Sequence, residues 1–342
     1  MHLTRLIPVG VALSVVILVL ISVGTGVSWT DITAVGLRTF ALAAGAALVR
    51  LGLQGLRFHV YVRGTLPTAL LPASTSVRVR AGSEFVALAT LPYIGDELVR
   101  IAWLRRRGVS TGGAAWLAYT ELFSDVVVTS ILALVAAVYA LALGGFGVGI
   151  LVAVLVAPIL TVHLLVVVWA ARGKVFQPLA LFALVSRVLG PTRGNRIAQS
   201  IADTLTQFSG TSRTFFTRTN VAAVVAGFAL TAGIATLPGL ALWLTFTAFG
   251  VRLTLWDTIL VSHASGALAN LPITLGGSGL GELGANLYTS TVYGVTHWPG
   301  VVTWRIATFH VPLIATGLAL VSVVTPRGRR QPAIRQVAQA TG

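Results

Sequence analysis

The feature that most constrains this chain is a series of apolar runs, each about as long as a membrane is thick. A helix that spans the hydrocarbon core of a bilayer needs roughly 20 apolar residues. With 56% hydrophobic and only 10% charged residues, an ordinary water-soluble domain is excluded. Six runs of the 342-residue chain are clear spanning segments: residues 6–23, 32–60, 112–140, 148–171, 221–249 and 301–324. We therefore expect an all-α, polytopic membrane helical bundle that forms one integral-membrane domain over residues 1–342.

Two further apolar segments, 85–94 and 258–275, do not read as ordinary spans. The first is too short to cross, because Glu84 and Asp96 bound it. The second carries Asn270 and Pro272 and runs into a glycine-rich break. Either both segments dip into the membrane and return, which gives six spans and two re-entrant broken-helix hairpins, or both cross, which gives eight spans.

The distribution of basic residues favours six spans. Of 24 Lys and Arg residues, 19 fall at Arg5, in 63–107, in 172–218 and after Pro326, and basic residues concentrate in cytoplasmic loops. Six spans place all four regions on one side, so we expect a multi-pass protein of the cell membrane with cytoplasmic N- and C-termini. Eight spans would put 100–107 outside.

A short internal repeat supports the hairpins. Residues 87–92 read Ala-Leu-Ala-Thr-Leu-Pro, and 267–272 read Ala-Leu-Ala-Asn-Leu-Pro. Three crossings separate the two copies, so the hairpins would enter from opposite faces and meet near the midplane, as in transporters built from inverted repeats. The first half is then 1–171 and the second half 220–325.

A basic segment, 172–219, separates these halves, and a basic tail, 326–342, follows them. Within the segment, Ile197, Ile201, Leu205 and Phe208 recur at helical spacing. We expect an amphipathic helix on the cytoplasmic membrane surface, although a plain connector would carry the same charge. Five arginines would face anionic headgroups: Arg187, Arg193, Arg196, Arg213 and Arg218.

Charged residues inside spans are costly and mark functional sites. Glu121 and Asp125 share a face of the third span at i, i+4 spacing, and Arg50, Gln54 and Arg57 share a face of the second span. Arg50 is expected at a depth similar to Glu121. These charges either form an ion pair that orients two helices or line a polar cavity that receives a substrate headgroup.

Both hairpins carry helix breakers and charge. In the first, Pro92 and Gly95 break the helix. Asp96 and Glu97 follow the break, and Glu97 is spaced to pair with Arg100.

The second hairpin has Pro272 and a turn made of Gly276, Gly277, Ser278 and Gly279, with Glu282 after it. Residues 279–284 match G-x-G-x-x-G, but no strand–helix–strand unit surrounds them, so we reject a dinucleotide site. What remains is a glycine-rich turn at a helix N-terminus, which favours an anion, or a tight turn without a ligand. Arg305 in the last span either anchors to outer headgroups or completes an anion path.

The sequence gives no sign of a metal or cofactor. Cysteine is absent, and the six His residues form no H-E-x-x-H pair. The formal charge of +15 is explained by topology, so no nucleic-acid partner is expected. Because no ATP-binding P-loop is present, transport would be passive or would use an ion gradient with a buried acid as proton carrier.

These motifs resemble the membrane domain of lysylphosphatidylglycerol synthases and its stand-alone, flippase-like relatives. The residues that carry the resemblance are Pro92, Gly95, Asp96 and Arg100, residues 106–110, Glu121 and Asp125, Pro272, Gly276, Gly277, Gly279 and Glu282, and Arg305. Family members usually carry Arg directly after the third-span glutamate, where this chain has Leu122. The resemblance implies a stand-alone multi-pass protein, without the soluble synthase domain, that handles phospholipids or lipid-linked glycan carriers.

The leading hypothesis is a lipid translocator, not an enzyme, whose partners are membrane lipids with anionic or phosphate-bearing headgroups. Arg50, Arg57 and Arg100 would attract phosphate and the turn at 276–281 would donate N–H groups. Glu121, Asp125 and Glu282 would balance these charges or bind a cationic headgroup. The alternatives are a membrane enzyme acting on lipid-linked sugars, with Asp96 or Glu121 as base, and an accessory subunit. Whether the chain forms a homo-oligomer stays open.

Overall fold

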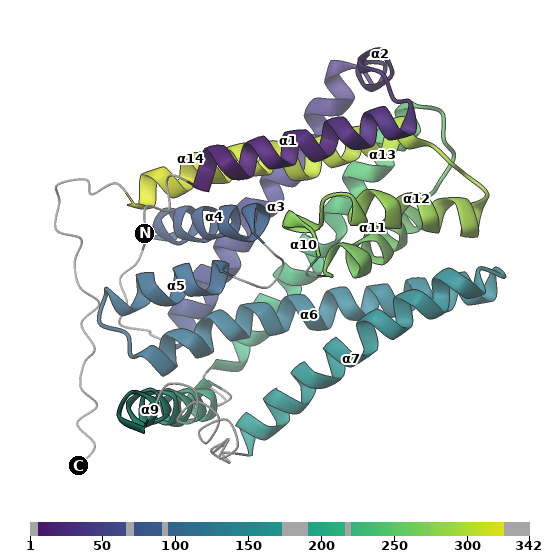
Figure 1. Ribbon diagram of the computed structural model, residues 1–342. Helices are drawn as coiled ribbons and strands as arrows, with labels where there is room; N and C mark the ends of the chain where they lie inside the picture. The colour runs from purple at the N-terminus through teal and green to yellow at the C-terminus, as the bar shows by residue number, and fades with distance from the viewer. Residues whose placement is uncertain are drawn as a thin grey trace.

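In the residues that the structure describes, the chain folds into helices joined by turns and short connections, without strands. The computed structural model describes residues 6–65, 72–90, 95–172, 191–215, 220–271 and 273–324. Five helical segments in this part are long and apolar enough to span a bilayer (Figure 1). They are α3 (Leu37–Thr65), α6 (Thr111–Ala142), α7 (Phe146–Ala171), α10 (Val221–Ala248) and the segment formed by α13 (Trp298–Arg305), the π-helix η4 (Ile306–His310) and α14 (Val311–Val324). The expected polytopic helical bundle is confirmed.

The sixth expected span, 6–23, coincides with α1 (Leu6–Thr25). Its apolar helical part, Ala12–Thr25, is shorter than the five candidate spans. Helix α1 lies along α14 (Figure 1), and Nε2 of His310, at the end of η4, is 3.2 Å from the carbonyl oxygen of Ser14 in α1. The short helix α2 (Trp29–Thr33), capped by the Ser28 side chain, then leads to α3.

Small residues let the long helices approach closely. The most extensive contact joins α3 to α10, and a Cβ atom at Gly227 of α10 would lie 2.2 Å from Cζ of Tyr61. On another face of α3, a Cβ atom at Gly55 would lie 2.4 Å from Cα of Val77. Close backbone approach of this kind is how membrane helices gain packing energy without a hydrophobic effect between them.

The two ambiguous segments form broken helices. The first comprises α4 (Ala73–Ala89) and α5 (Asp96–Arg105), and the second comprises α11 (Leu255–Ala269), the short η3 (Leu275–Gly277) and α12 (Leu280–Tyr293). Pro92 and Pro272 lie outside the described residues, while Gly95 has a φ of +120° that favours glycine. Helices α4 and α11 have 17 and 15 residues, so each ends short of a span.

The tips of the two broken helices touch. The backbone N–H of Gly276 donates a hydrogen bond of 2.9 Å to the carbonyl oxygen of Thr90. Figure 1 places α4 and α5 toward the left of the bundle and α11 and α12 toward the right. The described ends of the two broken helices therefore meet at Thr90 and Gly276.

Helix α9 (Pro191–Phe215) occupies part of the basic segment between the halves. It lies across the end of α6 (Figure 1), where the Phe208 and Trp116 rings meet edge to face with centroids 4.9 Å apart. The N–H of Gly112 donates to Oε1 of Gln207 at 3.1 Å. The arginine side chains predicted to face headgroups here lie outside the described side chains, as does the tail 326–342.

Candidate functional site

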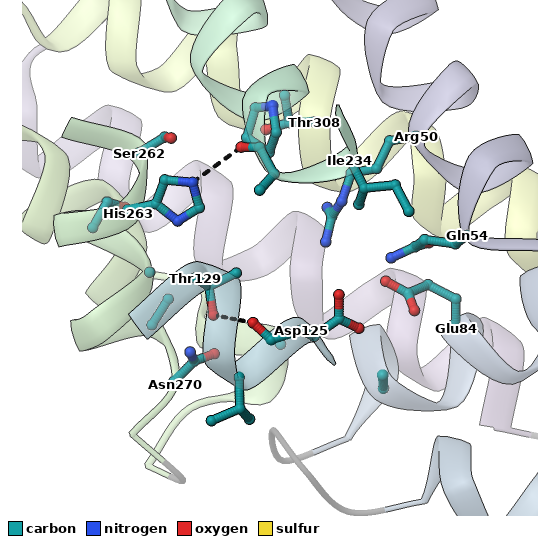
Figure 2. Close-up of a pocket in the computed structure, with 18 of the residues that line it drawn as sticks. Arg50, Gln54, Glu84, Asp125, Thr129, Ile234, Ser262, His263, Asn270 and Thr308 are labelled. Carbon is teal, nitrogen blue, oxygen red and sulfur yellow. Dashed lines mark hydrogen bonds between the residues drawn. The ribbon is translucent and has the colours of Figure 1, made fainter. Parts of the chain in front are cut away.

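A cavity of about 340 Å³ lies where the two broken helices meet. Its walls come from α3, α4, α5, α6, α7, α10, α11 and the last span, and Gly276 contributes from the second break. Figure 2 shows charged and amide side chains that surround this space. Charged groups that border it are Arg50, Arg80, Glu84, Asp96, Glu97, Arg100, Asp125 and Arg305.

Glu121 of α6 is the centre of the charge arrangement behind this wall. Its side chain is fully buried, and its two oxygens accept hydrogen bonds from three arginines. Oε1 accepts from Nη2 of Arg57 and from Nε of Arg80, each at 3.0 Å. Oε2 accepts from Nη1 of Arg100. Helices α3, α4 and α5 are thus all tied to one carboxylate of α6.

Arg57 binds the second acid of α6 as well. Its Nη1 and Nη2 atoms donate to Oδ1 and Oδ2 of Asp125 at 2.5 and 2.7 Å, and Nη1 also donates to the Thr231 hydroxyl at 2.9 Å. The shared helix face predicted for Glu121 and Asp125 is confirmed, because both bind the same guanidinium. The Asp125 side chain keeps 31% of its surface exposed, on the cavity side.

Two residues of α4 that the sequence analysis did not select complete the arrangement. Arg80 pairs with Glu84 at 2.5 Å and lies 3.8 Å from Asp96. Arg80 was counted among the basic residues that mark the cytoplasmic side, yet it is 4% exposed. The signal available was the i, i+4 spacing of Arg80 and Glu84, which suits a helix rather than a loop.

The first residues of α5 supply the remaining acids. Arg100 donates from Nη2 to Oδ2 of Asp96 at 2.9 Å, and the same atom lies 3.6 Å from Oε1 of Glu97. The expected pairing of Glu97 with Arg100 is thus present, although longer than that of Asp96. We call the whole set the arginine–carboxylate network: Arg57, Arg80, Glu84, Asp96, Glu97, Arg100, Glu121 and Asp125.

Arg50 differs from every arginine of the network. It was expected at the depth of Glu121, but the structure pairs Glu121 with other arginines, and Arg50 makes no hydrogen bond or ion pair with the described residues. Figure 2 shows its guanidinium and the amide of Gln54 pointing into the cavity. Gln54 is 3% exposed, and its Oε1 atom is buried without a hydrogen-bond partner among the described residues.

The second break holds its charges differently. Nε of Arg305 lies 3.2 Å from Oε1 of Glu282, and Nη2 of Arg305 donates to the carbonyl oxygen of Gly276 at 2.8 Å. Arg305 was expected either to anchor to outer headgroups or to complete an anion path. In the structure it borders the cavity, and Glu282 and Gly276 of the second hairpin bind its guanidinium. The N–H of Gly279 donates to Oε2 of Glu282 at 2.8 Å, so a protein carboxylate already occupies the N-terminus of α12.

Three of the expected N–H donors of this turn, those of Gly276, Gly277 and Gly279, already have acceptors in the protein. Gly276 donates to Thr90, and Gly277 donates to Thr274 at 3.3 Å. Of the predicted turn residues, Gly276 borders the cavity, whereas Gly277, Ser278, Gly279 and Glu282 are not among the residues that line it.

Other polar groups near the cavity are structural. His263 is buried and its Nε2 atom lies 3.0 Å from the carbonyl oxygen of Ala235.

Leu122, which stands where relatives usually carry Arg, borders the cavity. Within the described ranges, no group of three or more His, Asp or Glu side chains is arranged to hold a metal ion.

One family model matches the part of the chain that contains the cavity. Residues 7–316 match the model of the family described as lysylphosphatidylglycerol synthase TM region. No curated protein sequence matches the chain.

Proposed function

Since the chain belongs to the lysylphosphatidylglycerol synthase TM-region family, a membrane family related to lipid handling, we propose that it translocates a lipid headgroup. The cargo would be a phospholipid or a lipid-linked glycan carrier whose phosphate passes through the cavity between the two broken helices. This is a flippase-like or scramblase-like activity.

The observation that carries the proposal is a charged cavity enclosed by a membrane bundle. A volume of about 340 Å³ lies at the lower end of ordinary small-molecule sites. Ionised groups at membrane depth are costly and are kept where they serve a pathway or a site. A headgroup, which is itself polar, is the part of a lipid that needs such surroundings to cross.

Arg50 and Gln54 are the groups we assign to the phosphate. The arginines of the network are occupied by carboxylates, whereas Arg50 has no such partner among the described residues. A guanidinium and an amide that face the same space suit a phosphate diester, which accepts hydrogen bonds at two oxygens. Arg57 and Arg100 then serve to hold the walls in place.

The broken helices supply the path. We propose that α4 with α5 is a re-entrant hairpin from the cytoplasmic side and that α11 with α12 enters from the opposite side, in inverted-repeat relation. The basic residues of 63–107 and 172–218 support cytoplasmic placement of the first hairpin and of both termini. Contact between Gly276 and Thr90 would close the path between leaflets until the tips separate.

The test is reconstitution into vesicles that contain a fluorescent phospholipid, with a membrane-impermeant quencher added outside. Translocation is expected to bring inner-leaflet lipid to the quencher. Arg50→Gln should slow it about tenfold or more, because a hydrogen bond from a charged group contributes about 1.5–3 kcal/mol. Arg63→Gln, which changes an exposed arginine on the same helix, is the matched control. Equal rates for wild type and Arg50→Gln would reject the assignment.

The same vesicles test the enzymatic alternative, in which Asp96 or Glu121 is a base. Extraction of the lipids and mass analysis after incubation with a lipid-linked sugar would reveal a new product. We expect the lipids to be recovered unchanged.

A further inference from the structure

The arginine–carboxylate network contains more acids than arginines. Three guanidiniums, from Arg57, Arg80 and Arg100, face five carboxyl groups, and Arg50 adds a fourth cation at the cavity wall. Arg305 and Glu282 balance each other. The neighbouring segments outside the described residues, 66–71 and 91–94, contain no Asp, Glu, Lys, Arg or His. One carboxyl group of the described set therefore lacks a cation.

Glu97 is the carboxyl group with the weakest hold. Its ion pair with Arg100 is 3.6 Å long, and the same Nη2 atom binds Asp96 at 2.9 Å. Its side chain is 19% exposed and borders the cavity. The other acids each have a closer arginine partner: Glu84, Asp96, Glu121 and Asp125.

Asp96 and Glu97 are neighbours in the first turn of α5, and both lie against the same Nη2 atom of Arg100. Two ionised carboxylates only accept hydrogen bonds and their like charges repel, so a proton gained by either one relieves the pair. Since Asp96 has the shorter contact to Arg100, Glu97 is the carboxyl group that gains this proton most readily.

The groups that face Glu97 come from the helices packed against α5. Helix α4 presents Arg80 and Glu84, and α6 presents Glu121 and Asp125. Asp96 and Arg100 of α5 itself complete these surroundings, and Arg57 of α3 binds both acids of α6. With Arg50 included, the five carboxyl groups and four guanidiniums leave one negative charge in excess. An anionic phosphate that enters the cavity would therefore meet excess negative charge, which costs most where water is scarce.

We propose that Glu97 takes up one proton when the cavity receives a phosphate headgroup, so that the headgroup and the proton bind together. The inference rests on the proposed function for its transport consequence, but the binding linkage stands apart from it. Because linkage is reciprocal, phosphate binding strengthens proton binding and protonation strengthens phosphate binding by the same factor. A proton gradient would then drive the headgroup in the direction in which protons flow.

Proton uptake by the purified full-length protein tests the linkage without transport. Short-chain phosphatidylglycerol is added to the protein in weakly buffered detergent solution between pH 6 and 8, and a pH indicator reports protons taken up. Wild type is expected to take up close to one proton per bound lipid at the optimum, and Glu97→Gln close to none. Asp203→Asn, an exposed acid on α9 outside the cavity, should behave as wild type.

Glu97→Asp keeps a titratable group and should retain uptake at a shifted pH. The unfolding temperature of each variant shows whether it is folded. Binding without proton uptake in wild type, uptake that persists in Glu97→Gln, or failure of the folded wild type to bind the lipid would each overturn the proposal.

Vesicles with an imposed pH gradient separate this inference from the proposed function. Wild-type translocation should accelerate several-fold in the direction of proton flow, and Glu97→Gln should ignore the gradient. If wild type moves no lipid yet shows lipid-linked proton uptake, the proposed function fails and the proton site stands. If wild type translocates lipid at a rate independent of the pH gradient and takes up no proton on lipid binding, the proposed function stands and the proton site at Glu97 is rejected.

Discussion

The two broken helices reach the same cavity but are held in place by different forces. The first hairpin, α4 with α5, carries five ionised residues of the arginine–carboxylate network and is bound through Glu121 to α6. The second hairpin, α11 to α12, carries one ion pair with the last span. Its other contacts include hydrogen bonds between uncharged groups, such as that of Gly276 with Thr90, and close steric contacts, as where a Cβ atom at Gly284 would lie 3.0 Å from Cα of Ser265.

This difference indicates which hairpin should move when a charged ligand binds in the cavity. Ion pairs change strength when a charge enters the cavity, so the first hairpin is coupled electrostatically to a headgroup and its proton. Steric contacts between backbone and small residues do not respond to charge. We therefore expect the first hairpin to rearrange during translocation and the second to act as its platform.

The largest effect is expected at Glu121. Glu121→Gln removes the charge that three guanidiniums share at a fully buried site. Breaking a buried pair on one side costs about 3–5 kcal/mol, because the remaining charge stays uncompensated. Thermal unfolding in detergent should show a large fall in the midpoint. Glu84→Gln, which leaves Arg80 its contact to Glu121, should cost clearly less, and an equal loss would contradict the central role of Glu121.

The second largest effect is expected at the tip of the second hairpin. Gly276 has a φ of +54°, and a Cβ atom there would lie 2.5 Å from the carbonyl oxygen of Leu88. A left-handed backbone costs an alanine about 1–2 kcal/mol, and the clash with the Leu88 carbonyl oxygen adds to this cost. We therefore expect Gly276→Ala to lower stability and to separate the two tips. The measurement is the unfolding midpoint, together with translocation in vesicles.

Two further glycines separate strain from contact. Gly279 has a φ of +87° but open space around the added Cβ atom, and Gly266 has open space and an ordinary helical φ. Gly279→Ala should show the strain alone, and Gly266→Ala should be neutral or slightly stabilising. If Gly276→Ala and Gly279→Ala lost equal stability, the contact between the tips would make no measurable contribution to stability.

Sequence reasoning predicted the parts of the site that depend on local spacing. Glu121 and Asp125 share a helix face because they are four residues apart, and the breaks after α4 and α11 occur where proline and glycine follow. The family membership was also predicted from these motifs and is confirmed by the match over residues 7–316.

The choice of partner across helices could not be predicted in this way. The second span was expected at 32–60, whereas α3 covers Leu37–Thr65. A shift of five residues moves the helix by about 7.5 Å along its axis. That shift brings Arg57 rather than Arg50 toward Glu121 and leaves Arg50 in the cavity. Helix α3 packs against α10 through contacts such as Gly227 with Tyr61, and the local periodicity of the sequence does not show such contacts between helices.

A smaller effect is expected from the one ion pair of the second hairpin. Glu282→Gln, Arg305→Gln and the double variant form a double-mutant cycle, which isolates the energy of the pair. Because Arg305 is 11% exposed and also binds Gly276, we expect a coupling of about 1 kcal/mol from unfolding curves. A coupling as large as the loss at Glu121 would mean that both hairpins are held by charge.

The smallest effect is expected at Ser278, in the same turn. Its hydroxyl oxygen is buried and has no hydrogen-bond partner in the part of the chain that the structure describes, and the residue is not among those that line the cavity. Replacing an unsatisfied buried hydroxyl by hydrogen is neutral or stabilising. Ser278→Ala should therefore leave the unfolding midpoint and the affinity for short-chain phosphatidylglycerol unchanged, while Arg50→Gln lowers that affinity without changing the midpoint. A loss of lipid affinity in Ser278→Ala would place the turn inside the headgroup site, and the second hairpin would then recognise the ligand as well as support the first.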